Sequence, residues 1–274
     1  MVREAMIVSA QPEASEAGAR VLMAGGNAVD AAITAALVQG VVDPQMCGIA
    51  GFGNCQIHMP SKGVHTCIDF HGKTPLSATP EMWENLIEGE TRDGFGFVLK
   101  GNINDLGYQA ITTPGSLKAY GEAISQYGTW DWADIVAPAI AQADEGFRVR
   151  PHVYFWWVNG ADHGRVPVDQ RLSFSSIGKR SYFNSSGNLK KIGEKVHIPE
   201  MANTLRTIAK QGVESFYTGE IAEQIASDMK ANGGLLSYDD LASYSTTVTE
   251  PLTGDYRNYR ITTNEPPGGG VMLI

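Results

Sequence analysis

The sequence predicts a mixed α/β protein in which short strand pairs lie among longer helices. Two kinds of pattern support this class. Several stretches place apolar residues at helical spacing and end at glycine, and two others read as β-hairpins, "NCQIHMPSKGVHTCIDF" and "PLTGDYRNYRITTNEPP". Since no internal repeat, low-complexity tract or linker interrupts these patterns, we expect residues 1–274 to form a single domain.

The first two predicted helices follow each other directly. In "PEASEAGARVLMAGG" the residues Ala14, Ala17 and Val21 share one helical face, and the glycine pair at its end supplies a stop. The next helix begins at once in "NAVDAAITAALVQGVVDP". We expect Asn27 to cap it and Asp30 to lie in its first turn, where a carboxylate complements the free amides and the positive end of the helix dipole.

A glycine-rich turn, "GIAGFG", precedes the first hairpin, whose strands are predicted at Asn54–Met59 and Val64–Phe70 with the turn "PSKG" between them. The glycines have the composition of a phosphate-binding loop. However, no strand precedes them and no helix follows, which disfavours a nucleotide-binding oxidoreductase. We expect them instead to let the backbone pass close to another element or to a substrate.

Further helices are predicted in the second half of the chain. Thr113 and Pro114 read as the cap and first residue of a helix that ends at Gly128. A helix in "DWADIVAPAIAQADEGF" is expected to kink at Pro138. Residues 148–195 lack a clear period, which predicts irregular connections, one or two short helices and an aromatic cluster in the core or an interface. Amphipathic helices follow in "EMANTLRTIAKQG" and "TGEIAEQIASDMKANGG", and "SYDDLASY" has a capping-box pattern.

Composition and charge exclude several classes of partner. The net charge of −9 is spread along the chain and gives no basic stripe for nucleic acid or an anionic membrane surface. No apolar run approaches the roughly 20 residues that span a bilayer, and no signal-peptide core is visible. We therefore expect a cytoplasmic protein, or a periplasmic or secreted one if a leader was removed. Cys47, Cys55 and Cys67 lack CxxC spacing, which predicts reduced, buried thiols.

Residue chemistry alone does not assemble a catalytic set. The six histidines do not fall at metal-ligand spacing, and no GxSxG nucleophile motif is present. Four carboxylates are candidate general bases: Asp43, Asp69, Glu81 and Glu265. The sequence pairs no two of them, so this level of analysis leaves the function open.

Two long stretches resemble a known enzyme family. "SAQPEASEAGARVLMAGGNAVDAAITAALVQGVVDPQMCGIAGFGN" is similar to the N-terminal signature of the γ-glutamyltransferase (glutathione hydrolase) family, which runs through GGNAxDAAxA to a proline and a glycine-rich loop. "IPEMANTLRTIAKQGVESFYTGEIAEQIASDMKANGGLLSYDDLASY" resembles its second hallmark, with TLxxIAxxG, FYTGxIA, GGLLxxxDL and a closing tyrosine. The likeness covers nearly all of the chain and is broken mainly at about residues 86–107 and 153–195.

The resemblance implies an α/β (α+β) fold, the four-layer αββα sandwich of the N-terminal-nucleophile hydrolases, with this chain as the large-subunit portion. In this family the precursor cuts itself, and the new N-terminal threonine of the small subunit attacks an amide carbonyl, with its own α-amine as the base. The acyl group, γ-glutamyl or a related small group, then passes to water or to an amine, as in glutathione metabolism. The resemblance implies no metal and no organic cofactor.

The nucleophile is expected outside this chain. The family usually reads PPPSSGG where this chain reads "EPPGGG" at residues 265–270, and the family's threonine lies well downstream. We therefore expect the chain to continue beyond residue 274, with Val271–Ile274 opening a further helix, and we expect no catalytic residue within it. The implied partner is the small subunit of the same precursor, in an α/β heterodimer or a dimer of heterodimers, which acts on a small-molecule amide.

The expected substrate site departs from the family pattern. The γ-glutamyl enzymes carry D-[FY]-R-E-x-A-P after the hairpin strand, and the arginine forks onto the α-carboxylate of the substrate. Here the segment reads "DFHGKTP" at residues 69–75, so His71 replaces the arginine. Lys73 would add a point charge from the same face if the strand continued.

Two interpretations of this departure stay open for an enzyme, and a third possibility is a protein without catalytic activity. In the first, His71 and Lys73 bind a different acyl group and the protein is an amidohydrolase or acylase. In the second, the segment is displaced, another cation does the work of the arginine, and γ-glutamyl specificity is kept. A catalytically inactive scaffold protein is the third possibility, and it would be favoured if the downstream half lacked a threonine at the cleavage junction.

Overall fold

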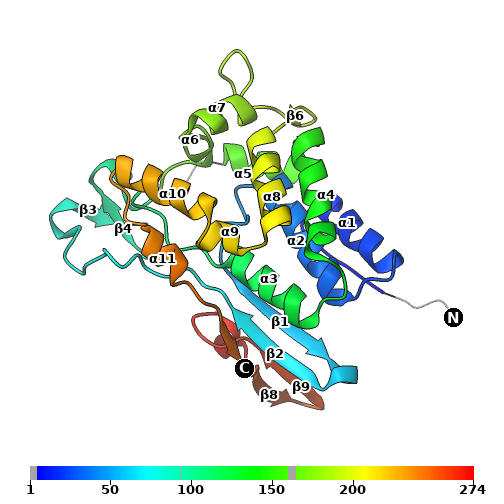
Figure 1. Cartoon of the computed structure of the whole chain (residues 1–274). Helices are drawn as coiled ribbons and strands as arrows, with labels where there is room; N and C mark the ends of the chain where they lie inside the picture. Colours follow the sequence, from blue (N-terminus) through cyan, green and yellow to red (C-terminus); the bar gives the residue numbers. More distant parts are fainter. Residues whose placement is uncertain (1–4, 93, 160–164) are drawn as a thin grey trace.

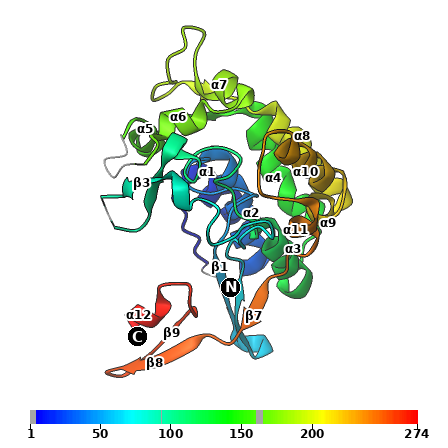
Figure 2. The same ribbon diagram turned by 90° about the vertical axis from the view of Figure 1, so that its left-hand side faces the viewer.

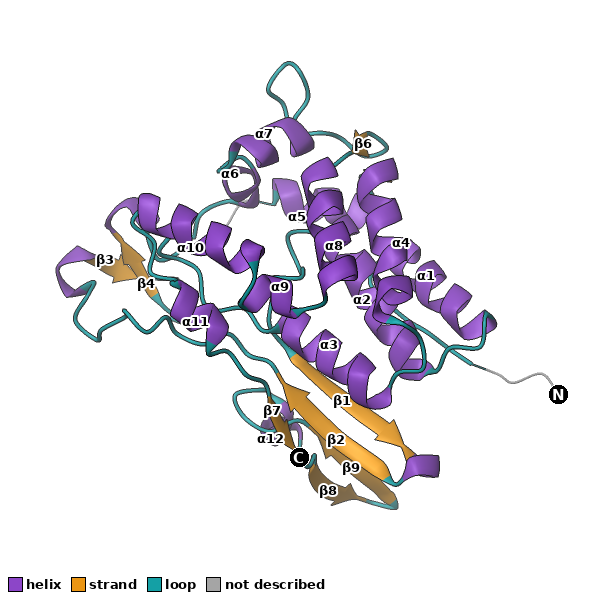
Figure 3. Cartoon of the chain, in the orientation of Figure 1, coloured by secondary structure: helices purple, strands orange, loops and turns teal. Residues whose placement is uncertain are grey.

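The computed structural model describes residues 5–92, 94–159 and 165–274. A layer of helices covers one face of a three-stranded antiparallel sheet (Figure 1, Figure 3). The sheet has the order β1-β2-β7, with strands at Asn54–Met59, Val64–Asp69 and Thr247–Thr249. The first predicted hairpin is therefore confirmed, with a 3-10 turn at Pro60–Lys62. The sequence does not predict β7, because three residues are too few to show a period.

The helical layer is built around α2 (Ala28–Val42), which packs against three other helices: α1 (Pro12–Met23), α3 (Ser116–Tyr127) and α4 (Trp132–Glu145). Eleven of the 15 residues of α2 are buried, as expected of a helix that is apolar on nearly all sides. The outer face of α4 is covered by α8 (Pro199–Gln211). The small side chains of α2 thus let it sit at the centre of the layer.

The predicted cap of α2 is confirmed. The side chain of Asn27 accepts the backbone N–H groups of Val29 and Asp30, and the Asp30 carboxylate accepts the N–H of Asn27 at 2.8 Å. That carboxylate is completely buried and also accepts the N–H and the hydroxyl of Thr129, at 2.8 and 2.6 Å. Burial raises the pKa of Asp30, but the hydrogen bonds outweigh burial and lower the pKa overall. Asp30 therefore ties the start of α2 to the loop after α3.

The predicted start of α3 is wrong by two residues. The helix begins at Ser116 with Gly115 as its N-cap. Thr113 instead exchanges two backbone hydrogen bonds with Lys73, at 3.1 and 2.8 Å. This pairing satisfies both polar backbone groups of Thr113 at once, so the long-range contact takes precedence over the local cap.

The middle of the chain holds more helix than predicted. The part of residues 148–195 that the structure describes contains three short helices instead of one or two: α5 (Pro151–Val158), α6 (Val168–Leu172) and α7 (Ser176–Tyr182). The aromatic cluster divides, because Trp157 is buried in the core whereas the Phe155 side chain is 53% exposed. The helix α4 is continuous through Pro138, and the kink expected there stays a prediction.

The remaining predicted elements are confirmed. They are the helices α10 (Glu220–Ala231), α11 (Tyr238–Ala242) and α12 (Gly270–Leu273) and the strands β8 (Leu252–Tyr256) and β9 (Tyr259–Thr263). The capping box of α11 is formed by Ser237 and Asp240, as its sequence pattern indicates. One short helix, α9 (Glu214–Tyr217), is additional.

Two further strand pairs are not predicted by the sequence: β3 (Ile87–Glu90) with β4 (Phe97–Leu99), and β5 (Phe147–Arg148) with β6 (Lys195–Val196). Short 3-10 turns at Glu84–Leu86 and Lys100–Asn102 flank the first pair. The β3–β4 hairpin lies at the side of the molecule opposite α1 (Figure 1). It falls within residues 86–107, where the family resemblance is interrupted.

The β8–β9 hairpin lies on the face of the sheet that the helices leave free (Figure 2). Ile57 points into the helical core, so its neighbour Gln56 points the other way, where its Nε2 donates to Thr262 Oγ1 of β9 at 2.9 Å. Cys67, opposite Gln56 in the register, is completely buried. The hairpin thus starts a second strand layer against the first, as in a stacked-sheet sandwich.

Candidate substrate-binding site

The predicted site residues His71 and Lys73 lie on the segment that follows β2. The strand ends at Asp69, and Phe70 turns into the core. The His71 imidazole folds back so that its Nδ1 lies 2.5 Å from Asp69 Oδ1, which also accepts the backbone N–H of His71 at 2.9 Å. Because a carboxylate only accepts hydrogen bonds, Nδ1 carries a proton and Nε2 is left for a ligand. Both side chains are partly exposed, so a ligand can reach this pair.

Lys73 has different partners. Its Nζ lies 3.3 Å from the Ser245 hydroxyl and 4.9 Å from the centre of the Tyr244 ring. The His71 ring lies 6.0 Å from the ring of Phe52 in the glycine-rich loop. A shared face for His71 and Lys73 requires a strand that continues to Lys73, and this condition is not met because β2 ends at Asp69.

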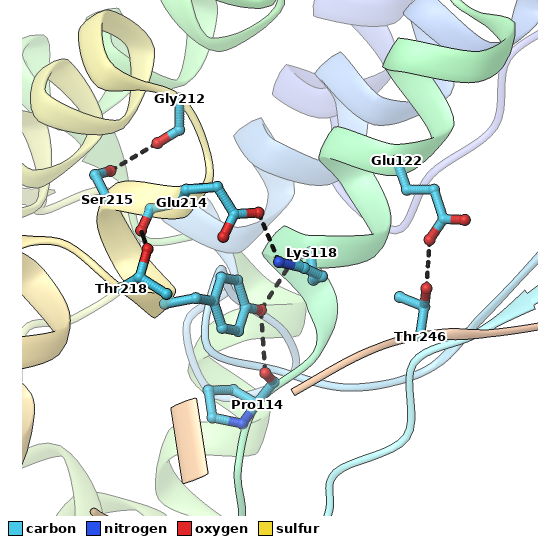
Figure 4. Close-up of polar contacts among 9 residues, drawn as sticks. Pro114, Lys118, Glu122, Gly212, Glu214, Ser215, Thr218 and Thr246 are labelled. Atoms are coloured by element: carbon cyan, nitrogen blue, oxygen red, sulfur yellow. Dashed lines mark hydrogen bonds and ion pairs between the residues drawn. The ribbon is translucent and has the colours of Figure 1, made fainter. Parts of the chain in front are cut away.

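Two tyrosines hold this segment in place. Tyr244 donates its hydroxyl to the His71 carbonyl at 2.9 Å, and its ring stacks on Tyr217 with the ring centres 5.9 Å apart. Tyr217 is completely buried; it donates to the Pro114 carbonyl at 3.0 Å and accepts the N–H of Lys118 at 3.1 Å, and both of these partners are labelled in Figure 4. Burial raises the pKa of both phenols, that of Tyr244 to about 12, so both hydroxyls remain donors at neutral pH.

Neighbouring contacts fasten α3 to the same elements (Figure 4). Lys118 Nζ lies 2.6 Å from a carboxylate oxygen of Glu214 in α9. Thr246, which directly precedes β7, donates its hydroxyl to Glu122 of α3. The start of α3, α9 and the chain leading into β7 therefore form a frame behind the His71 segment.

The glycine-rich loop passes close to this frame, as predicted. The Gly51 carbonyl accepts the backbone N–H groups of Gly115 and Ser116 at 2.9 and 3.1 Å. At Gly115 an added Cβ would lie 2.0 Å from the Tyr244 hydroxyl and 2.5 Å from the Phe70 carbonyl oxygen, so no side chain fits. At Gly51 in the loop itself, an added Cβ would lie 3.0 Å from the Gly48 carbonyl oxygen and 3.1 Å from Ser116 Oγ, which is the close approach to another element that the sequence favours over nucleotide binding.

The other candidate carboxylates have separate surroundings. Asp69 is engaged by His71, whereas Asp43 is buried and accepts Gln11 Nε2 at 2.9 Å, which joins the start of α1 to the end of α2. Within the described ranges no cluster of three or more His, Cys, Asp or Glu side chains is placed to hold a metal ion. None of the helices described there combines the length and apolarity that a membrane crossing requires.

We expect Tyr244→Phe to lower the free energy of unfolding by about 1 kcal/mol, because the His71 carbonyl loses its hydrogen bond in a partly buried place. Amide hydrogen exchange at residues 70–73 should become faster, which a general loss of packing elsewhere would not produce. Tyr238→Phe is the matched control. It also removes a tyrosine hydroxyl that donates to a backbone carbonyl, that of Thr218 at 2.8 Å, but this hydrogen bond does not involve the His71 segment. Equal exchange at residues 70–73 in both variants would contradict a positioning role for Tyr244.

Sequence reasoning did not assign Tyr217 or Tyr244 to the site. Both belong to the family hallmarks quoted above, FYTGxIA and the closing tyrosine, so a signal was present. The contact itself joins residues that are 173 positions apart, which no local pattern reports.

Two strand layers packed on each other under a covering helical layer are the arrangement expected of an N-terminal-nucleophile hydrolase. Solved structures bear out this class: the γ-glutamyltranspeptidase of Helicobacter pylori aligns with a TM-score of 0.85 and 30% identity, over 98% of this chain and 72% of its own. The family model described as Gamma-glutamyltranspeptidase matches residues 14–274. The chain belongs to the γ-glutamyltranspeptidase family.

Two relatives show which part of a precursor the chain represents. The Acylase ACY 1 proenzyme of Pseudomonas sp. strain V22 is 35% identical over 272 residues, or 98% of this chain. The Glutathione hydrolase proenzyme of Pseudomonas sp. strain A14 is 34% identical over 270 residues, also 98% of this chain. The chain spans 46% and 44% of the lengths of these two relatives. It corresponds to the large-subunit portion of such a precursor.

Proposed function

We propose that this chain is the large-subunit portion of a self-processing amide hydrolase or acyltransferase. The observation that carries the proposal is the family match over residues 14–274. In the proposed reaction, the hydroxyl of an N-terminal threonine attacks the amide carbonyl, the C–N bond breaks, and the amine leaves with a proton. Water or an acceptor amine then releases the acyl group. This acyl transfer needs no metal or organic cofactor.

In this proposal residues 1–274 act as one structural unit that meets a small subunit cut from the same precursor. The assembly is an α/β heterodimer, or a dimer of heterodimers, in the cytoplasm, or in the periplasm or outside the cell if a leader was removed. Support comes from the two relatives, which are both named proenzymes.

We further propose that the acyl group is not γ-glutamyl. An arginine presents two parallel N–H donors to a carboxylate, whereas His71 commits Nδ1 to Asp69 and offers a ligand only Nε2. Lys73 is engaged with Ser245 and with the face of Tyr244. The similar identities to an acylase and to a glutathione hydrolase, 35% and 34%, are compatible with an acylase.

Self-processing is tested by expressing the complete gene product and separating it on a denaturing gel. We expect two fragments, and N-terminal sequencing of the smaller one should begin with threonine. A single uncut chain would favour the inactive scaffold over an enzyme.

Acyl specificity is tested on the same preparation with γ-glutamyl-p-nitroanilide and its α-carboxamide analogue. We expect slow turnover of both at similar rates, because the bidentate contact to the α-carboxylate is missing. Fast cleavage that depends on the α-carboxylate would contradict the proposal that the acyl group is not γ-glutamyl, and would support γ-glutamyl specificity instead.

A further inference from the structure

A largely apolar cavity of about 360 Å³ opens beside the His71 segment. Two stretches of chain form most of its wall, one running on from Lys73 and the other leading up to Thr113. The wall residues used below are Thr74, Trp83, Asn104, Gln109, Thr112 and Leu235. The volume falls within the range of small-molecule sites, about 300–1,000 Å³.

The cavity adjoins the candidate substrate site across one layer of backbone. Thr112 in its wall lies directly against Gly72, where an added Cβ would be 2.3 Å from Thr112 Oγ1. The next residues on each side, Lys73 and Thr113, are joined by two backbone hydrogen bonds. Two residues, Gly72 and Lys73, therefore separate His71 from Thr74, where this stretch first borders the cavity.

The walls of the cavity are fixed by hydrogen bonds. The indole Nε1 of Trp83 donates to Gln109 Oε1 at 3.1 Å, and Gln109 Nε2 donates to the Gly233 carbonyl at 3.2 Å. On the same stretch as Trp83, the Ser77 hydroxyl donates to the Leu235 carbonyl at 2.9 Å. The Trp83 ring is thus held in one orientation, which is what a pre-formed binding surface requires.

One polar atom in the wall lacks a partner. Asn104 Nδ2 donates to the Phe97 carbonyl at 2.8 Å, whereas Asn104 Oδ1 is buried and accepts no hydrogen bond from the residues that the structure describes. A buried acceptor without a donor is unfavourable, and a ligand N–H would satisfy it. Trp83 and Asn104 also line an adjoining cavity of about 510 Å³ under the β3–β4 hairpin, so both lie at a junction of two open spaces.

We propose that this cavity binds the end of the acyl group that is remote from the scissile amide, and that this end is an aromatic ring carrying an N–H donor. The inference rests on the proposed function, in which the segment after β2 recognises that remote end. The ring would lie against Trp83, and its N–H would donate to Asn104 Oδ1. Asn104 lies within residues 86–107, where the family resemblance is interrupted, so this preference belongs to this chain and not to the family pattern.

The test uses the complete, self-processed protein and a pair of anilides that differ in one hydrogen-bond donor. In indole-3-butyryl-p-nitroanilide three methylenes join the indole ring to the carbonyl of the scissile amide, and the 1-methylindole analogue lacks the ring N–H. We expect kcat/KM to be about tenfold higher for the indole compound, since one buried hydrogen bond distinguishes the two. In Asn104→Leu this ratio should fall to about one, and in Asn188→Leu, an exposed asparagine outside the cavity, it should stay near ten.

A ratio of two substrates in one variant cancels any loss of folded protein. A wild-type ratio near one, or an unchanged ratio in Asn104→Leu, would overturn the proposal. Titration calorimetry with indole-3-butyramide separates this result from a failure of the proposed function. If no anilide is cleaved but the amide binds, and Asn104→Leu weakens its binding about tenfold, the cavity assignment stands and the proposed function fails. If neither indole compound is cleaved or bound, the cavity assignment is wrong, and the self-processing experiment decides the proposed function separately.

Discussion

His71→Arg is expected to raise kcat/KM for γ-glutamyl-p-nitroanilide by about 30-fold, which corresponds to about 2 kcal/mol of transition-state binding. The guanidinium would present the parallel pair of N–H donors that matches an α-carboxylate. The backbone at this position should stay in place, because Tyr244 holds the carbonyl of residue 71 and not its side chain. The measurement is steady-state hydrolysis by the complete, self-processed protein.

His71→Lys is the matched control for this gain. Lysine supplies a positive charge without the planar fork, so we expect an increase of only a few-fold. Equal gains from arginine and lysine would show that charge alone limits γ-glutamyl binding. No gain from arginine would mean that residue 71 does not face the α-carboxylate, and the departure at this position would then not explain specificity.

Asp30→Ala is expected to lower the free energy of unfolding by about 3 kcal/mol or more, the largest stability effect that we predict. The carboxylate accepts the backbone N–H groups of Asn27, Thr129 and Trp130 and the hydroxyl of Thr129. Truncation removes these bonds and leaves buried donors without an acceptor. Urea unfolding of the complete protein measures the change.

Asp30→Asn keeps the shape of the side chain and one acceptor oxygen. This variant should therefore fold, and its free energy of unfolding should fall by only about 1–2 kcal/mol. Asp134→Asn is the control, because Asp134 also lies in the first turn of a helix but is exposed. We expect that substitution to change the free energy of unfolding by less than about 0.5 kcal/mol. Similar losses in both asparagine variants would show that the buried network of Asp30 contributes little.

The same carboxylate predicts a pH dependence. In the folded protein the pKa of Asp30 lies below its ordinary value of 3.8, so as the pH falls this carboxylate is protonated at a higher pH in the unfolded chain than in the folded protein. The contribution of Asp30 is therefore fully present above the unfolded pKa and is lost as the pH falls through the folded pKa. Urea unfolding between pH 5 and about pH 2 should show a smaller loss of stability in Asp30→Asn than in the wild type. Parallel acid profiles would contradict this assignment.

The sequence predicts those features of the fold that depend on interactions between residues close together in the chain. The cap at Asn27, the capping box at Ser237 and the first hairpin each depend on residues a few positions apart, and the structure confirms all three. The start of α3 was missed because Thr113 pairs with Lys73, 40 positions earlier in the chain. A strand as short as β7 forms because it pairs with a neighbouring strand, and its few residues cannot show an alternating pattern in the sequence.

The candidate site follows the same division. The sequence singles out His71 as a site residue because the family motif has arginine at this position. The structure adds that one of the two ring nitrogens, Nδ1, is hydrogen-bonded to Asp69. The cavity beside it could not be predicted, since Trp83, Asn104 and Leu235 come from three distant stretches. Whether Asn104 Oδ1 has a hydrogen-bond partner depends on residues that are distant in the sequence, so the sequence alone does not predict that it is unpaired.

The bond between Tyr244 and His71 also sets an order of events during synthesis. The donor lies 173 residues after the acceptor, so at about 5–20 residues per second the ribosome needs roughly 10–35 s to supply it. The first hairpin and the α1–α2 pair are complete long before that moment. The segment that carries His71 is therefore synthesised early, but its carbonyl gains this hydrogen bond only after Tyr244 has been synthesised.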